Sequence, residues 1–392
     1  SKFGRGRSAD FLEYVRVCFD SGDWRDWYGW RYSSIKRYTP DHYKVGYMSV
    51  AGMRTVYDEP LFTEKYYERI NGKRPGSLPL PLGVMRKTVK EVSGKKPRES
   101  FREIEEAFLA DWRKGFEERG PFMPMDTVTG APRRFSEFTG LTMAGDRIFA
   151  IHKGLERAAS IARIDAGGKV EDLRPFASLT SAPQWSESLE KLFWSETVVD
   201  KRWSMKSVSV IRFMDPEDKK IHNLTREGRL FNPAPQPDGG KLAVTEYAPD
   251  SRSSLLVIDG RSGEELERYA APDSLQIVEP VWTEGGIYVT AISDGGIGIY
   301  RAGTVFSEVV SPLPVSIRQP RGSAGGRIMF VCDRSGVDEV YSLDTETGTI
   351  EQVTCTRYGV ADFAFSECGR ELYYSALAPD ARYVCRTAAA EL

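Results

Sequence analysis

The stretch Val360-Ala-Asp-Phe-Ala-Phe365-Ser366-Glu-Cys-Gly369-Arg-Glu-Leu372-Tyr-Tyr-Ser375 is the clearest copy of a repeat that fills the C-terminal two thirds of the chain. An apolar run, a Ser-x-x-Gly turn and a second apolar run predict two strands joined by a tight turn. Just upstream, Asp333-Arg-Ser-Gly336 and Leu343-Asp344-Thr-Glu-Thr-Gly348 are typical of two further turns, since Asp bonds the turn backbone and Gly takes a positive φ. One repeat therefore holds four short strands.

The repeat recurs at a spacing that predicts the fold. Taking residues 142, 185, 235, 282, 322 and 365 as equivalent, the steps are 43, 50, 47, 40 and 43 residues. Four short strands with their turns need about 40–45 residues, which is the length of a propeller blade. The predicted fold class is therefore mainly β with an α-helical N-terminal lobe, the β part being a six-bladed β-propeller over residues 122–392.

The two ends of the β region predict how the ring of blades closes. The last copy of the repeat has only three strand patterns, and Met125–Gly130, ahead of the first copy, matches Leu343–Gly348 almost letter for letter. Because an outer strand follows Gly348, the match predicts that residues 131–136 supply the missing strand of the last blade. That pairing would join the first blade to the last and leave no open edge.

Residues 1–121 are predicted to form a separate helical lobe. Apolar side chains recur there every three or four residues, and Asp41 after Thr39-Pro40 is typical of a helix cap. The longest stripe is ended by Gly120-Pro121. The predicted helices are Ala9–Phe19, Tyr43–Tyr57, Glu59–Ile70, Leu82–Val92 and Pro97–Arg119.

Composition excludes several classes of protein. The 392 residues are 41% hydrophobic and 28% charged, with net charge −2 and no run of 18–20 apolar residues, so we expect no transmembrane segment. Residues 1–120 hold 24 Lys and Arg against 18 Asp and Glu, too even a balance for a nucleic-acid binder. The five cysteines include no CxxC pair, and neither G-x-S-x-G nor a Walker A motif occurs.

The Asp-Arg-Ser-Gly, Asp-Thr-Glu-Thr-Gly and Phe-Ser-x-x-Gly-x-x-Leu signature resembles the TolB-like, WD40-like (PD40) propeller repeats of bacterial envelope proteins. The resemblance covers about 265 residues and is specific for fold, not for ligand. It implies an exported protein, in the periplasm or at the cell surface of a Gram-negative bacterium.

The N-terminal part resembles the C-terminal helical lobe of a gluzincin-type (peptidase MA) metallopeptidase domain. The resemblance rests on Phe3-Gly-Arg-Gly-Arg7, on Ser34 to Tyr47 and on Arg54-Thr-Val-Tyr57. In that family an upstream His-Glu-x-x-His binds zinc. None of the three histidines here belongs to such a motif, so we expect no cofactor in this chain, zinc only in a longer parent, and an upstream domain that docks on residues 1–121.

Three groups of residues are candidate sites. Tyr43 and Tyr47, one helical turn apart, are candidates for stabilising an oxyanion beside a zinc cleft, or are core aromatics. Three carboxylates near inner strands are candidates to line a propeller channel: Glu196, Glu246 and Asp333. They either form a glycosidase pair or are acids that occur there by chance. Aromatic residues clustered within nine positions either pack the lobe or bind a peptide, a sugar or another domain: Trp24, Trp27, Tyr28, Trp30 and Tyr32.

These patterns favour a non-catalytic recognition or scaffold module that binds a peptide or protein partner. The alternatives are the C-terminal portion of a zinc-dependent peptidase whose metal-binding half lies upstream of Ser1, and a propeller glycosidase or carbohydrate-binding protein. No nucleic-acid partner is expected.

Overall fold

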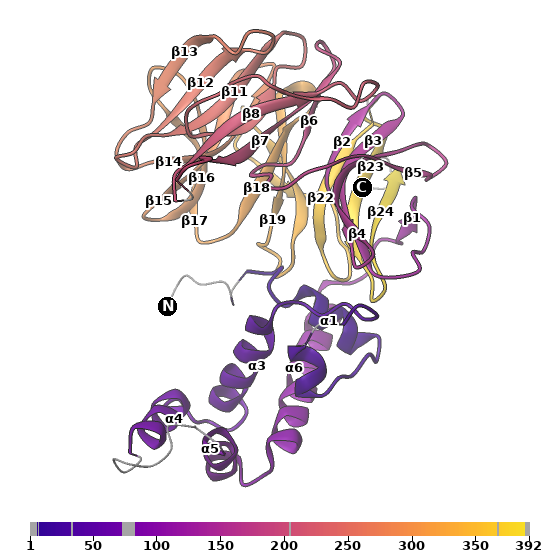
Figure 1. The fold of residues 1–392 in the computed structure, drawn as a ribbon, viewed down its shortest axis with the longest axis vertical. Coiled ribbons are helices and arrows are strands. Elements are labelled where there is room, and N and C mark those ends of the chain that lie inside the picture. The colour runs from indigo at the N-terminus through magenta and orange to yellow at the C-terminus, as the bar shows by residue number, and fades with distance from the viewer. Residues whose placement is uncertain are drawn as a thin grey trace. The chain divides into compact units, whose positions relative to one another are not determined.

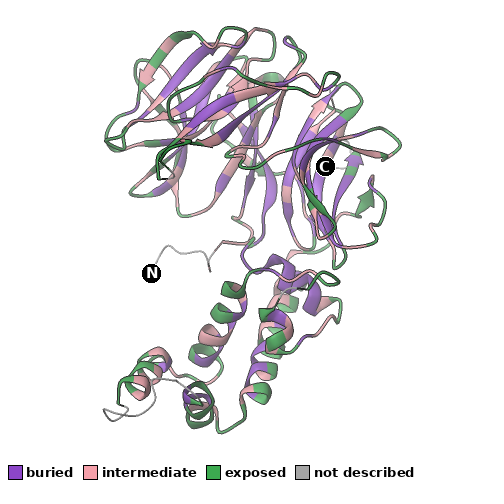
Figure 2. Cartoon of the chain, in the orientation of Figure 1, coloured by how far each residue is buried: buried purple, intermediate pink, exposed green. Residues whose placement is uncertain are grey.

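The structure is a computed structural model that describes Gly6 and residues 8–32, 34–72, 83–203, 205–366 and 368–388. The chain divides into two compact units, a helical unit that spans Phe11–Pro121 and a β unit that spans Phe122–Leu392 (Figure 1). Burial follows the elements in both units: the strands are buried along their middles, and the turns between them are exposed (Figure 2).

The helical unit confirms the predicted helices to within a few residues at most ends. Asp41 caps α3, its carboxylate accepting from the backbone N–H of Tyr43 at 3.0 Å. Leu82, the predicted start of one helix, lies outside the described residues. One short helix, α2, was missed because its Trp- and Tyr-rich sequence has no apolar period. The described helices are α1 Glu13–Asp20, α2 Trp27–Arg31, α3 His42–Thr55, α4 Phe62–Asn71, α5 Val84–Ser93 and α6 Pro97–Arg119.

The strands of the β unit fall into six sets in chain order, each of which turns back and forth antiparallel. The first set is β2 Ser136–Ala144, β3 Arg147–Gly154, β4 Arg157–Ile164 and β5 Val170–Pro175; the second is β6 Gln184–Ser186, β7 Lys191–Val199, β8 Ser207–Met214 and β9 Ile221–Asn223; the third is β10 Leu230–Pro235, β11 Lys241–Tyr247, β12 Ser253–Asp259 and β13 Glu265–Ala270. The fourth is β14 Gln276–Thr283, β15 Gly286–Ser293, β16 Gly296–Arg301 and β17 Ser307–Leu313; the fifth is β18 Ile317–Gly322, β19 Arg327–Cys332, β20 Glu339–Asp344 and β21 Ile350–Gln352; the sixth is β22 Val360–Phe365, β23 Glu371–Leu377 and β24 Arg382–Ala388, with β1 Asp126–Thr127 on β24.

The second to fifth sets are separate four-stranded sheets. The sixth and first sets form one eight-stranded sheet, in the order β22-β23-β24-β2-β3-β4-β5, with β1 paired to β24 off that path. A single parallel pair, Glu137 with Arg382, joins these two sets.

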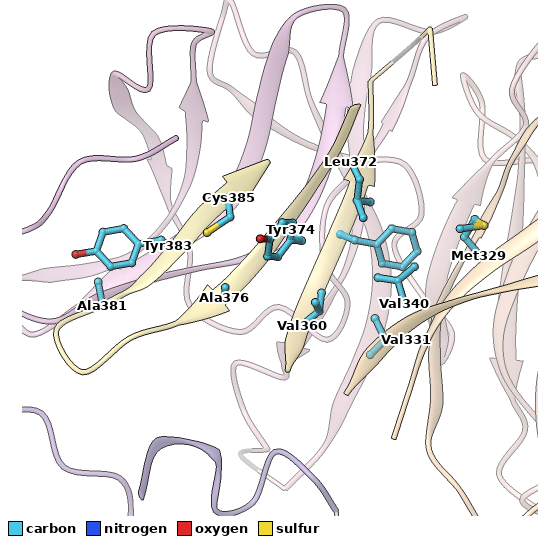
Figure 3. Close-up of a cluster of buried hydrophobic side chains, with 11 residues drawn as sticks. Met329, Val331, Val340, Val360, Leu372, Tyr374, Ala376, Ala381, Tyr383 and Cys385 are labelled. Atoms are coloured by element: carbon cyan, nitrogen blue, oxygen red, sulfur yellow. The ribbon is translucent and has the colours of Figure 1, made fainter. Parts of the chain in front are cut away.

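Six hydrophobic clusters of described residues lie between neighbouring sets. The cluster between the fifth and sixth sets, for example, packs Met329, Val331 and Val340 against Leu372 and Tyr374 (Figure 3). Each set thus buries one face against the preceding set and one against the next, which is a propeller-like arrangement. The clusters join the first set to the second, the second to the third, the third to the fourth, the fourth to the fifth, the fifth to the sixth and the sixth to the first.

The strand that completes the sixth set corrects one prediction. It is β1, in which Asp126 pairs with Arg386 and Thr127 with Cys385. Within residues 131–136 only Ser136 belongs to a strand, and it pairs with Gly154 of β3. The prediction that 131–136 supplies this strand was therefore wrong.

The physical reason is that Met125–Gly130 was aligned with the wrong part of the repeat. The backbone N–H groups of Val128 and Thr129 donate to Val384 O, while Thr129 Oγ1 accepts from Val384 N at 3.1 Å. The fifth set closes in the same way, with Val353 and Thr354 on Val340, and so does the second set, with Leu224 and Thr225 on Ile211. The segment therefore matches the fourth strand of a set and not the turn at Leu343–Gly348.

A candidate binding cavity

The first strands of all six sets line one cavity of about 780 Å³. The six positions aligned from the sequence repeat all lie in these first strands, and all of them contribute to the wall: Thr142, Trp185, Pro235, Trp282, Gly322 and Phe365. Because equivalent positions of successive repeats meet around one space, the cavity lies on the common axis of the sets.

Irregular backbone marks this lining. Five of the six first strands shift register near the cavity, and such bulges re-aim side chains and free backbone groups. Three residues at the shifts have positive φ: Gly140 at 65°, Asn232 at 51° and Gln319 at 53°. Two of these are not glycine, so the surrounding contacts must stabilise an uncommon conformation.

Two carboxylates hold the bulges in place. Asp362 Oδ2 accepts from the Gly140 N–H at 2.5 Å, and a Glu279 oxygen accepts from the Gln319 N–H at 2.5 Å. Each bond joins neighbouring sets, the sixth to the first and the fourth to the fifth. Asn232 also joins neighbouring sets, the third to the fourth, since its Nδ2 donates to Val278 O at 2.7 Å.

Arg321 is the cation that faces these acids. Its guanidinium donates to Gln184 Oε1 and, at 3.4 Å, to Leu141 O. Burial raises the pKa of Glu279 and Asp362, and Arg321 counteracts that rise by Coulomb attraction. Burial lowers the pKa of Arg321, and the two acids counteract it. Arg321 is therefore the cation that two acids share, one from the fourth set and one from the sixth.

Aromatic rings complete the wall. Trp282 Nε1 donates to Ala234 O at 2.9 Å, and Trp185 Nε1 donates to Glu187 Oε2 at 2.6 Å. Trp185 also stacks on Phe149, with ring centroids 5.7 Å apart. The indole N–H groups are thus used within the protein.

The acids proposed from the sequence lie elsewhere in the sets and do not line the cavity. Glu196, on β7, contacts Trp194 Nε1 at 3.2 Å and Arg212 Nε at 3.4 Å. Glu246, on β11, pairs with Arg268 of the same set. Asp333 follows β19, where it accepts from the Ser316 N–H at 2.7 Å. Each one has a partner within its own set.

Sequence reasoning missed Glu279, Arg321 and Asp362 as a group. A signal was present, because Asp362, Gln319, Glu279 and Asn232 each stand three residues before an aligned repeat position. A polar residue recurring at one register position inside apolar strands indicates a face that turns to the axis.

The tryptophans of the helical unit mostly pack its interior. Trp30 is buried, and its Nε1 donates to Glu105 Oε1 at 3.1 Å. Trp24 is half-buried between Phe19, stacked at 4.9 Å, and the Arg102 guanidinium, 3.8 Å from the ring centroid. Trp27 is also half-buried and lies edge-on to Tyr28.

Tyr43 and Tyr47 lie on α3 as predicted from their spacing. Tyr43 is 53% exposed and stacks on His42; Tyr47 is 38% exposed and lies edge-on to Phe11. Of the Phe3–Arg7 stretch that carried part of the peptidase resemblance, only Gly6 is among the described residues.

Glu105 gives the helical unit a pH-dependent stability. Burial raises the pKa of its carboxyl to about 7, against the lowering effect of the Trp30 N–H and Arg102. A pKa raised on folding means that the stabilisation is complete below the unfolded pKa, about 4.3, and is lost as pH rises through 7. Glu105→Gln keeps an acceptor for Trp30. Above pH 8 we therefore expect the free energy of unfolding of this variant to exceed that of wild type by at least about 1 kcal/mol.

Thermal unfolding at pH 5 and pH 8.5 checks this expectation. Glu117, exposed on the same helix, is the matched control, and Glu117→Gln should change stability equally at both values. A Glu105→Gln variant that gains nothing between pH 5 and pH 8.5 would contradict the assignment.

Two features are absent from the described residues. No group of three His, Cys, Asp or Glu side chains in these parts of the chain is arranged to hold a metal ion. No helix there is both long and apolar enough to span a bilayer.

Comparisons with known proteins return similarity of fold only. No protein-family model matches the sequence, and no curated protein matches it. The β-propeller domain of the Trilobed protease from Pyrococcus furiosus is 13% identical, with a TM-score of 0.42, over 65% of this chain and 98% of that one. A putative TolB from Agrobacterium tumefaciens is 14% identical, with a TM-score of 0.45, over 65% and 89%. The acylaminoacyl peptidase of Pyrococcus horikoshii is 11% identical, with a TM-score of 0.41, over 68% and 54%.

Proposed function

We propose that the β unit is a closed ring of six blades and acts as a non-catalytic recognition module of a bacterial cell-envelope protein. The six clusters between successive sets and the addition of β1 to β24 support the ring. In this account the eight-stranded sheet is two blades joined by one parallel pair. The envelope location rests on the repeat signature alone.

The cavity on the axis is the proposed binding site, and its ligand is a peptide segment of a partner protein. The observation that carries the proposal is that equivalent positions of all six repeats line one space of about 780 Å³. That volume lies within the range of small-molecule and peptide pockets. Aromatic faces and backbone acceptors suit an extended peptide, which offers N–H groups and side chains along its length.

Glu279, which lines the cavity, and the buried Asp362 argue for recognition and against hydrolysis. Oxygens of Glu279 and Asp362 already accept backbone N–H groups from neighbouring sets. A glycosidase pair needs one carboxyl free to donate a proton and another free to attack or to activate water. We therefore assign these two acids to holding the blades and shaping the cavity.

Binding to an array of random-sequence peptides tests the proposal. Gln236 lines the cavity and is half-buried, so Gln236→Trp should occupy the space and abolish binding to the peptides that wild type retains. Leu266→Trp, on the exposed outer strand β13, adds the same side chain away from the cavity and should leave binding unchanged. Binding that survives Gln236→Trp would place the site elsewhere.

The rival function, part of a zinc peptidase, differs in its metal content. We expect the purified chain, loaded with excess zinc and desalted, to retain far less than one equivalent, because no described group of ligands favours it. Metal analysis by inductively coupled plasma mass spectrometry measures this. Stoichiometric zinc that protects the chain against thermal unfolding would favour the peptidase and count against the recognition module.

A further inference from the structure

The wall of the axial cavity is rich in hydrogen-bond acceptors and poor in free donors. Several positions of its first strands and turns are proline, which has a carbonyl but no N–H: Pro233, Pro235, Pro237, Pro280 and Pro320. The wall therefore offers a ligand carbonyl oxygens at places where other residues would also offer amide hydrogens.

The strong donors of the wall are already engaged. Both indole N–H groups, of Trp185 and Trp282, donate to protein oxygens. The Arg321 guanidinium donates to Gln184 and Leu141, and Asn232 Nδ2 donates to Val278 O. What these residues leave open toward a ligand is the π-face of a ring.

One acceptor is spare. Gln319 is one of the residues that line the cavity. Its side-chain oxygen Oε1 is buried and has no hydrogen-bond partner. A buried amide oxygen without a partner carries an energetic cost.

The charged residues of the wall favour the same kind of ligand as its acceptors do, a cation that donates hydrogen bonds. Glu187, Asp238 and Glu279 line the cavity, and Arg321 is the one cationic residue in its described lining. Glu187 and Asp238 are exposed, and their carboxylates attract a cation to the cavity. Trp faces beside carboxylates also bind cations directly.

We propose that the axial cavity selects a peptide segment bearing arginine or lysine, whose cationic side chain is held by the carboxylates of Glu187 and Asp238 and a Trp face. The inference rests on the proposed function, since it names the chemistry of the peptide that the recognition module takes. It assigns charge selection to two exposed acids that hold no blade in place.

A pair of probes that differ only in charge tests the inference. Acetyl-Gly-Arg-Gly-Arg-Gly-amide and its citrulline counterpart have nearly the same shape, but citrulline is neutral. We expect wild type to bind the arginine peptide at least about 10-fold more tightly than the citrulline peptide at low salt, and this ratio to fall at high salt. Isothermal titration calorimetry measures both affinities.

Variants separate this inference from the proposed function. Glu187→Gln combined with Asp238→Asn should remove most of the arginine preference and leave citrulline-peptide affinity unchanged. Glu264→Gln combined with Asp294→Asn, two exposed acids outside the lining, is the matched control and should keep the preference. Equal binding of both peptides, abolished by Gln236→Trp, would overturn the charge selection alone. If neither peptide binds, the charge selection is wrong. The recognition site is still supported in that case if Gln236→Trp abolishes the binding of array peptides.

Discussion

Asp362→Ala is expected to lower the free energy of unfolding of the β unit by about 3–5 kcal/mol. Asp362 is 1% exposed, and its carboxylate accepts the N–H groups of Gly140 and Phe363 at 2.5 and 2.8 Å. Alanine would leave the Gly140 N–H without its acceptor in a dry site and would remove one carboxylate from beside Arg321. Urea unfolding followed by tryptophan fluorescence measures the loss.

Two other variants serve as comparisons for Asp362→Ala. Asp362→Asn keeps an acceptor oxygen and should cost less than Asp362→Ala. Asp294→Ala, on an exposed turn, should change stability by less than about 0.5 kcal/mol. A loss from Asp362→Ala as small as that from Asp294→Ala would show that the carboxylate does not hold the sixth set to the first.

The pH dependence of this site has a definite sign. Burial raises the pKa of Asp362, so its contribution to stability is complete below the unfolded pKa of about 3.9 and is lost as pH rises through the folded pKa. Asp362→Asn cannot titrate at this position. Its unfolding free energy should therefore fall less than that of wild type as pH is raised from acid to neutral.

Thr129→Val is expected to destabilise the β unit by about 2 kcal/mol, the second largest effect. Thr129 is 2% exposed, and its Oγ1 accepts from the Val384 N–H at 3.1 Å. Valine has the same shape and leaves that buried N–H without a partner. Denaturation measured as above should also show near wild-type stability for Thr129→Ser, which retains the hydroxyl.

The fifth set provides an internal reference for the same bond. Thr354 Oγ1 accepts from the Val340 N–H at 2.9 Å, and Thr354 is 1% exposed. Thr354 Oγ1 also donates to Glu339 Oε2 at 2.6 Å, so Thr354→Val should cost at least as much as Thr129→Val. A neutral Thr129→Val beside a destabilising Thr354→Val would mean that residues 126–129 do not close the sixth set.

The sequence predicted the strand sets well because their turns have distinctive chemistry. Asp and Gly at fixed offsets mark several of the hairpins, and the aligned positions from Thr142 to Phe365 all lie in first strands. The closing strand was misplaced because one short motif, Asp-Thr-x-Thr-Gly, fits both a turn and an outer strand. The threonine bond that distinguishes the two involves Val384, which is 255 residues away in sequence.

The cavity was harder to predict than the strands. Glu196, Glu246 and Asp333 were chosen as acids near inner strands, but alternation along a strand decides which face an acid takes, and bulges shift that alternation. Glu279 and Asp362 lie at such bulges in β14 and β22. Their partner Arg321 comes from β18, so the group exists only once three sets are assembled.

A disulfide between β1 and β24 tests the closure of the ring most directly. Thr127 is opposite Cys385, and the bond from Val128 N to Val384 O at 2.7 Å makes theirs a non-hydrogen-bonded pair. The Cα atoms of such pairs are about 4.5 Å apart, within the range that a disulfide bridges. Burial raises the pKa of the Cys385 thiol to about 12, so oxidation requires copper phenanthroline or prolonged incubation at high pH.

The measurement is peptide mapping of Thr127→Cys after oxidation, with Ala131→Cys and Arg133→Cys treated in parallel. A strand formed by residues 126–129 predicts a linkage between positions 127 and 385 in the first variant and none to Cys385 in the other two. Linkage of Cys385 to position 131 or 133, with none to position 127, would contradict the account.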